Sequence, residues 1–152
     1  MEDLYEIVKF QFDTILEYVS LRRDPDQNIS KQLSPVVKDT PTKDRNPYQG
    51  VFEWLRSVFK VEKIFKVIID DLVPYPHTDT AIIAAVKEFD IEIWDWRKLD
   101  LSSQTIFSAA ETTRELYLHS SGNEAVLRSW GCKHGLALLP NVSPSSAYDF
   151  TA

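Results

Sequence analysis

The fold is decided by residues 61–71, VEKIFKVIIDD, and by residues 91–96, IEIWDW. Both stretches are rich in β-branched and aromatic side chains, which favours buried strands. A segment with helical spacing, marked by Ile82, Val86 and Phe89, lies between them. Alternation of strand and helix predicts parallel strands that are joined by right-handed crossovers, with helices packed against the sheet.

The same order occurs a third time further along the chain. Residues 114–119 alternate Leu116 and Leu118 and lead through Ser-Ser-Gly into a helix that carries Trp130. The spacing of this unit, Leu-x-Leu-x-x-Ser-Gly-Asn-x-x-x-Leu, also resembles a leucine-rich repeat of roughly 20 to 29 residues. An open parallel sheet and a short arc of such repeats therefore both fit the pattern.

Two helices are expected before these units. Residues 4–21 place apolar side chains at helical intervals, and residues 50–60 do the same with Trp54 in their sequence. The predicted fold is thus α/β, with two N-terminal helices followed by three βα units. Thr78 or Thr80, and Ser102, are expected to cap helices of the second part. The expected organisation is a helix over 1–23, a Pro-rich linker over 24–49, an α/β domain over 50–140 and a disordered tail over 141–152.

Composition narrows the classes of partner and compartment. The chain has 152 residues, a formal charge of −6 and one cysteine, Cys132. The negative charge disfavours nucleic acid, and a single cysteine cannot form an internal disulfide. No apolar run approaches the roughly 18 to 20 residues that span a bilayer, so no membrane contact is expected. We therefore expect a location in the cytosol, or in the nucleus.

Carboxylates are expected to gather where the strands end. Asp70 and Asp71 follow the first strand, and Asp95 and Asp100 lie near the end of the second. Open α/β sheets bind ligands at this edge, and oxygen clusters bind Mg²⁺. Solvated turn carboxylates explain the same residues without a metal, and this is the interpretation that we favour.

A second candidate site uses sulfur and imidazole. Cys132, His134 and His119 are the residue types that a thiol nucleophile and its base require. The short Cys-x-His spacing is also typical of a structural thiol beside a surface histidine, and we favour that interpretation. The chain has no Gly-x-Ser-x-Gly, Gly-rich phosphate loop or His-Glu-x-x-His sequence. We expect neither enzymatic activity nor a cofactor.

The four tryptophans are the expected apolar anchors of an interaction surface: Trp54, Trp94, Trp96 and Trp130. For Trp94 and Trp96 we also expect packing on opposite faces of their strand, because helices over both faces of a parallel sheet would bury each.

Three segments resemble a known family. Residues 64–71, 92–101 and 121–130 are similar to the non-catalytic region that precedes the subtilisin-like protease domain in certain large fungal proteins. The resemblance covers roughly residues 50–139 and implies an intracellular accessory region of a multidomain protein. It does not transfer proteolysis, because the chain lacks the Asp, His and Ser motifs of a subtilase, including the Gly-Thr-Ser-Met-Ala-like segment.

The sequence therefore predicts a non-catalytic accessory or protein-interaction domain. A sheet or array that ends after three units has an uncovered edge, which predicts a protein partner or self-association. The alternatives are a small enzyme that uses the acidic edge or the Cys and His residues, and a truncated relic of a longer protein.

Overall fold

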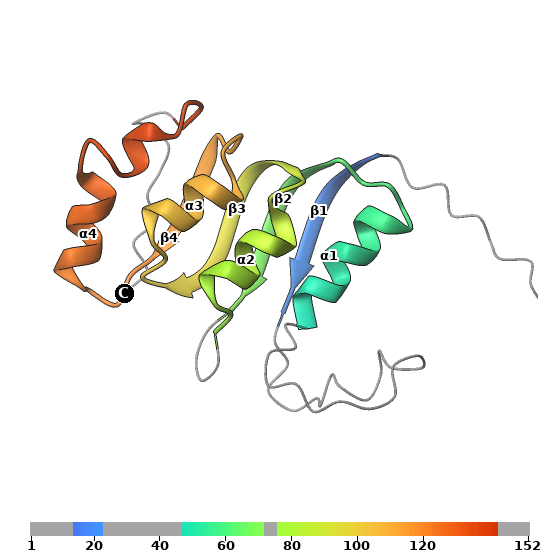
Figure 1. Ribbon diagram of the computed structural model, residues 1–152, viewed down its shortest axis with the longest axis horizontal. Helices are drawn as coiled ribbons and strands as arrows, with labels where there is room; N and C mark the ends of the chain where they lie inside the picture. Colours follow the sequence, from blue (N-terminus) through green and yellow to red (C-terminus); the bar gives the residue numbers. More distant parts are fainter. Residues whose placement is uncertain (1–13, 23–46, 72–75, 143–152) are drawn as a thin grey trace, which may run out of the picture.

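The computed structural model describes residues 14–22, 47–71 and 76–142. Strands and helices alternate along these residues (Figure 1). The elements are β1 (Ile15–Leu21), α1 (Pro47–Ser57), β2 (Lys63–Asp70), α2 (Asp79–Val86), β3 (Asp90–Leu99), α3 (Ser103–Ala109), β4 (Glu115–His119), α4 (Glu124–Gly131) and the short 3₁₀ helix η2 (Leu136–Leu138).

The four strands form one parallel sheet in the order β1-β2-β3-β4. Each strand therefore neighbours the next one along the chain. The register aligns Val19 with Val67, Val67 with Trp94, and Trp94 with Leu116, so one row of apolar side chains crosses the whole sheet. All four side chains in this row are buried.

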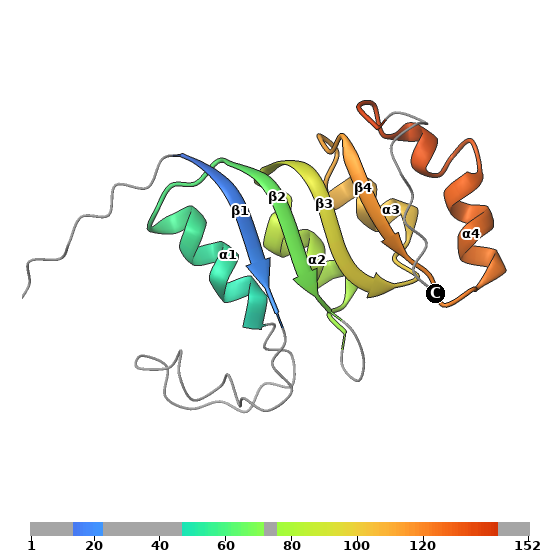
Figure 2. The same ribbon diagram turned by 180° about the vertical axis from the view of Figure 1, so that it is seen from behind.

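The helices α1, α2 and α3 lie on one face of this sheet. They stand in front of the strands in Figure 1 and behind them in Figure 2, while α4 lies beyond β4 at the end of the array. Right-handed crossovers that always step to the next strand in one direction must all pass over the same face. The described residues therefore form an α/β fold with one open parallel sheet, and α1, α2 and α3 cover one of its faces.

The core lies between the sheet and the helix layer. Its largest fully buried side chains include Trp94, Trp96 and Phe52, with the Phe52 ring 6.3 Å from that of Trp96. Trp94 and Trp96 stack on each other at 5.4 Å between ring centroids. Both are buried as predicted, but the expectation of opposite faces was wrong, because residues two apart in a strand point the same way.

The second part of the chain follows the predicted units closely. Thr78 and Ser102 cap α2 and α3, each accepting a hydrogen bond from a backbone N–H of the first turn. Asn123 does the same for α4. These side chains satisfy N–H groups that a helix start leaves unpaired, which is why the helices begin there.

The first predicted helix is wrong over its described part. Residues 15–21 form β1, which pairs with β2 along its length. Ile15, Tyr18 and Val19 are strand-forming residue types, and pairing with β2 satisfies the backbone along one side of the segment. The remainder of the predicted helix, residues 4–13, lies outside the described residues.

The predicted domain boundaries change accordingly. β1 pairs in the same sheet as β2, β3 and β4, so residues 15–21 belong to the α/β domain and not to a separate N-terminal unit. Helix α1 begins at Pro47, inside the predicted linker, of which residues 24–46 lie outside the described part. At the other end Val142 packs against the core, so the domain continues past 140; residues 143–152 are not described.

Candidate functional site

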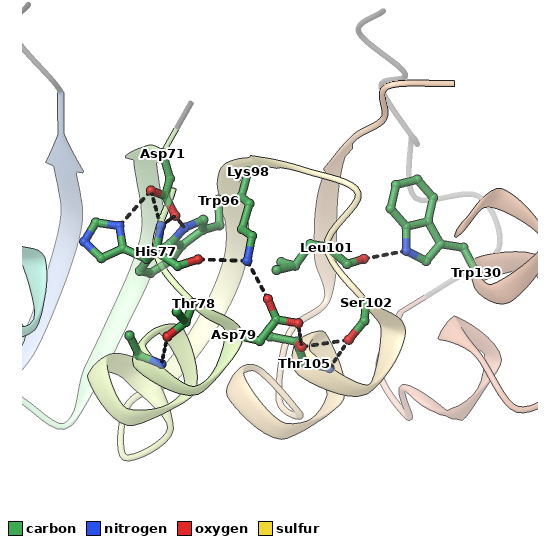
Figure 3. A network of polar contacts seen from close by, with 11 residues as sticks. Asp71, His77, Thr78, Asp79, Trp96, Lys98, Leu101, Ser102, Thr105 and Trp130 are labelled. Atoms are coloured by element: carbon green, nitrogen blue, oxygen red, sulfur yellow. Dashed lines mark hydrogen bonds and ion pairs between the residues drawn. The ribbon is translucent and has the colours of Figure 1, made fainter. Parts of the chain in front are cut away.

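Asp71 is the centre of a buried polar network at the carboxyl end of β2 (Figure 3). Its Oδ1 accepts hydrogen bonds from the backbone N–H of His77 at 2.9 Å and pairs with His77 Nδ1 at 2.7 Å. Its Oδ2 accepts one from Trp96 Nε1 at 2.7 Å. The His77 ring stacks on Tyr48, 4.9 Å away. This carboxylate thus joins the loop after β2 to β3.

The network continues from His77 to the start of α3. Lys98 Nζ donates to the His77 carbonyl at 2.8 Å and pairs with the carboxylate of Asp79. The other Asp79 oxygen accepts from Thr105 Oγ1 at 2.7 Å, and Thr105 also contacts the cap residue Ser102 (Figure 3). Side chains from β3 and α3 therefore hold the first turn of α2.

The next loop is held in the same way. Trp130 Nε1 donates to the Leu101 carbonyl at 2.8 Å (Figure 3). Asp100 has a φ of 57°, a left-handed conformation that Asp tolerates, and accepts from the Ser121 backbone N–H at 3.0 Å. Consecutive strand-to-helix loops are thus tied by partners from the following unit.

The electrostatics of these carboxylates fit a structural role. Burial alone would raise the pKa of Asp71, but its hydrogen bonds from His77 and Trp96 outweigh that effect and hold the pKa below the ordinary value. Burial also raises the pKa of Asp79, and the contacts with Lys98 and Thr105 more than reverse it. Both groups are therefore stabilised as carboxylates that accept hydrogen bonds.

The four carboxylates of the predicted acidic edge lie in different surroundings. Asp71 is buried in the loop network, Asp100 binds Ser121, and Asp70 and Asp95 each contact Arg97. Within the described ranges, no group of three or more His, Cys, Asp or Glu side chains is placed to hold a metal ion.

A second set of side chains, most of them polar, lies on the sheet face opposite the helices, which we call the open face. It consists of side chains that alternate with the buried ones along each strand: Tyr18, Ser20, Lys66, Ile68, Asp70, Ile93, Asp95, Arg97, Glu115, Tyr117 and His119. No helix of the described residues covers this face (Figure 2). Pairing between neighbouring strands brings oppositely charged side chains of this face close together.

Arg97 is the centre of the open face. Its Nη1 donates to Asp70 Oδ1 at 3.0 Å, and its Nε donates to Asp95 Oδ2 at 3.2 Å. The other oxygen of Asp95 lies 2.8 Å from His119 Nε2. Burial would raise the pKa of Asp95, but His119 and the charge of Arg97 lower it overall. The Arg97 side chain remains 40% exposed while its position is fixed.

Aromatic and basic side chains flank this charged centre. Lys66 Nζ lies 5.5 Å from the centre of the Tyr117 ring, a cation–π contact that spans from β2 to β4. Tyr18, in the edge strand β1, is 52% exposed. The open face thus presents both fixed charge and accessible aromatic surface.

The predicted tryptophan anchors occupy two kinds of position. Trp94, Trp96 and Trp130 are buried, and a buried side chain of the folded domain contributes to its core rather than to a contact surface. Trp54 is 52% exposed on α1 and packs edge-on against Phe59 at 4.4 Å. Of the four, Trp54 is therefore the one available to contact another surface.

The residues of the predicted thiol site have different contacts in the described structure. Cys132 is exposed after α4, and its Sγ donates to the Ser129 carbonyl at 3.2 Å. His119 instead faces Asp95 on the open face, and His134 is exposed. The hydrogen bond of Cys132 is therefore made within the chain segment at the end of α4.

Sequence reasoning missed Arg97, the organising residue of the open face. The signal was present in the alternation of β3, where Asp95 and Arg97 occupy the positions between and after two buried tryptophans. Residues that pair with Asp95 and Arg97 in the neighbouring strands lie on the same face. Applying this rule to the sequence would have identified Asp70 and Tyr117 as well.

Comparison of the chain with protein-family models, with curated proteins and with solved structures finds no match in any of the three. Among the helices of the described residues, none has the length and apolar character that crossing a membrane requires.

Proposed function

We propose that this domain is a non-catalytic interaction module that binds a protein partner through the open face. The observation that carries the proposal is Arg97, which two carboxylates hold in place while the side chain stays 40% exposed. Fixing a long side chain in advance lowers the entropy that a partner must overcome on binding. Arginine is also enriched among the residues that dominate protein interfaces.

The geometry of Arg97 leaves donors for a ligand. A guanidinium has five N–H donors, and the contacts to Asp70 and Asp95 use two of them. The remaining side of a planar guanidinium suits a carboxylate or a backbone carbonyl. A polypeptide segment with an acidic side chain is therefore the chemistry that this centre fits.

The surroundings favour a protein over a nucleic acid. The open face mixes Lys66 and Arg97 with Asp70, Asp95 and Glu115, and the whole chain has a net charge of −6. A nucleic-acid backbone is bound by surfaces with an excess of basic residues. Exposed Tyr18 instead offers the amphipathic contact area that protein interfaces use.

An accessory role within a larger assembly also agrees with the resemblance to the region upstream of fungal subtilase domains. That association remains a prediction, as does an intracellular location. In this role the domain supplies binding and orientation, and the catalytic chemistry belongs to another domain or chain.

The test is a quantitative affinity purification of the tagged full-length chain from its source cells. We expect one set of co-purifying proteins to be depleted at least tenfold by Arg97→Ala, because truncating a hot-spot residue, a class in which arginine is enriched, costs about 2 kcal/mol or more, and about 1.4 kcal/mol is a tenfold change in affinity. Arg128→Ala is the matched control, since Arg128 is an 82% exposed arginine on α4. Equal recovery with both variants would reject the open face as the binding surface.

Self-association is the second way in which the sheet could be completed. β1 is an edge strand of the sheet, and its Ile15 side chain is 57% exposed. Edge strands of this kind pair with other chains unless charge or Pro prevents it. Light scattering at micromolar concentration decides this point: a mass of twice 17.5 kDa supports self-association, and a mass of 17.5 kDa rejects it.

A further inference from the structure

The two ends of the array differ in chemical character. Beyond β4, the segment that contains α4 and η2 buries Trp130 and Leu136 in the core. The outer surface of α4 carries the ion pair of Glu124 with Arg128, in which both side chains are 82% exposed. At the other end, β1 and α1 present three large apolar side chains that are 52% to 59% exposed: Ile15, Trp54 and Val58. One end is therefore charged, and the other is apolar.

The apolar side chains of α1 lie on the outer side of the helix. Arg56 points along the array toward α2, because it pairs with Glu88, just after that helix, at 2.8 Å. The Val58 N–H donates to the Trp54 carbonyl at 2.9 Å, so Val58 continues the last helical turn. At 100° per residue, Trp54 and Val58 then lie on the opposite side of the helix from Arg56, away from α2. Figure 1 shows α1 as the last helix of the layer, with β1 beside it.

β1 adds a strand edge to this apolar end. Within the described residues it is the first strand of the sheet order, and β2 pairs with one of its sides. The outer side of such a strand presents a row of backbone N–H and C=O groups to another chain. Lysine and proline commonly prevent this pairing at sheet edges. The sequence of β1, ILEYVSL, contains neither, and its one charged residue is Glu17.

A second copy of the chain matches this end when two apolar ends meet. Stacking the copies head to tail would instead bury the charged pair on α4 under an apolar surface, which carries a large desolvation cost. Two equal ends meet about a two-fold axis, the symmetry that most protein dimers have.

The two-fold arrangement also suits both elements of this end. An axis perpendicular to the sheet pairs β1 antiparallel with β1 of the second copy and places both helix layers on the same side, so that the two α1 helices meet. With the axis at Tyr18, the middle residue of β1, Glu17 lies opposite Val19 of the second copy. Like charges are therefore not placed opposite each other.

We propose that two copies of this chain associate through this end, with antiparallel pairing of β1 and with Trp54 and Val58 packed between the α1 helices. The inference rests on self-association, the second candidate function, and names the surface that carries it. It does not involve Arg97, so it can fail while partner binding at the open face stands.

Light scattering and sedimentation of the full-length chain over a dilution series test the proposal. We expect a mass of twice 17.5 kDa at micromolar concentration and no larger species, because a two-fold contact leaves no second apolar end exposed. Trp54→Asp should raise the dissociation constant of the dimer by about tenfold or more, since tryptophan is enriched among the residues that dominate interfaces. Ile15→Lys should weaken the dimer as well, because it places a lysine on the strand edge.

Leu138→Asp is the matched control. Leu138 is also 52% exposed, but it lies on η2 at the other end of the array, so this variant should remain a dimer. Arg97→Ala should remain a dimer too, which separates this contact from binding at the open face. Circular dichroism establishes that each variant is folded, and Val58→Asp replaces Trp54→Asp if that variant is not.

Three results would overturn the proposal. A monomeric unaltered chain rejects both this surface and self-association. A dimer that Trp54→Asp and Ile15→Lys leave intact rejects the surface, while self-association stands. A series of larger species that grows with concentration rejects the two-fold arrangement, because only head-to-tail contacts continue in this way.

Discussion

Replacing Asp71 by Asn tests the energetic role of the loop network. The Asp71 side chain is 1% exposed and accepts hydrogen bonds from two N–H groups of His77 and from Trp96 Nε1. Asparagine keeps one oxygen, which can still accept from His77. Its NH₂ group, however, faces the indole N–H of Trp96, so two donors oppose each other in a buried site.

The expected loss is about 3 kcal/mol of unfolding free energy. A hydrogen bond to a charged group contributes about 1.5–3 kcal/mol, and leaving a buried donor unpaired costs about 1–3 kcal/mol. For a domain of this size a loss of about 3 kcal/mol lowers the Tm by roughly 12 °C. Urea denaturation followed by circular dichroism measures the change in free energy.

Asp70→Asn is the matched control for this experiment. It makes the same chemical change at the neighbouring residue, whose side chain is 25% exposed and pairs with a 40% exposed arginine. Exposed ion pairs contribute about 0–1 kcal/mol, so the loss should stay below about 1 kcal/mol. Equal losses in the two variants would refute the reasoning, because burial of the network would then have no energetic consequence.

The pH dependence of stability follows from the same groups. The pKa values of Asp71, Asp79 and Asp95 lie below their ordinary values in the folded domain. Their contribution to stability is therefore complete above the unfolded pKa of about 3.9 and is lost as the pH falls through the folded values. Unfolding free energies measured from pH 7 to pH 2 should decline below about pH 4, and less steeply in Asp71→Asn.

Two further pairs of variants test the packing. Trp94→Phe and Trp96→Phe remove the same volume, but the buried Nε1 of Trp94 has no hydrogen-bond partner within the described structure, whereas that of Trp96 binds Asp71. Trp96→Phe should cost about 1–3 kcal/mol more, and equal losses would contradict the assignment. Gly135→Ala should destabilise the turn after α4, because an added Cβ would lie 2.0 Å from the Ser129 carbonyl oxygen. Gly50→Ala, in open space on α1, should instead raise stability by about 0.5–1 kcal/mol, as thermal melts will show.

Most of the sheet could be predicted from sequence, and β1 shows why part of it could not. In β2, β3 and β4 the apolar alternation and the helix caps Thr78 and Ser102 agree with each other. In residues 15–21 the three-residue separation of Leu16 and Val19 favours a helix, whereas Ile15, Tyr18 and Val19 are residue types that favour a strand. Pairing with β2, a contact with residues almost 50 positions away, decides between them.

The candidate site was predictable in composition but not in geometry. The sequence indicated that Asp70, Asp71 and Asp95 lie near strand ends. It did not indicate their separation, which arises because neighbouring residues of a strand point to opposite sides. Asp71 thereby enters the loop network, and Asp70 joins Asp95 at Arg97 on the open face. The cation that organises this face is an arginine, which a search for metal ligands does not consider.

The most direct test of the proposed function is site-specific photo-crosslinking in source cells. A photo-reactive amino acid is placed at Tyr18 or Lys66 on the open face, and at Gln104 or Lys87, exposed residues on the helix side of the fold. The account predicts one crosslinked protein of defined mass from the two open-face positions and none from the two helix-side positions. Crosslinks from the helix side alone, or equally from both sides, would contradict the claim that the open face is the partner surface.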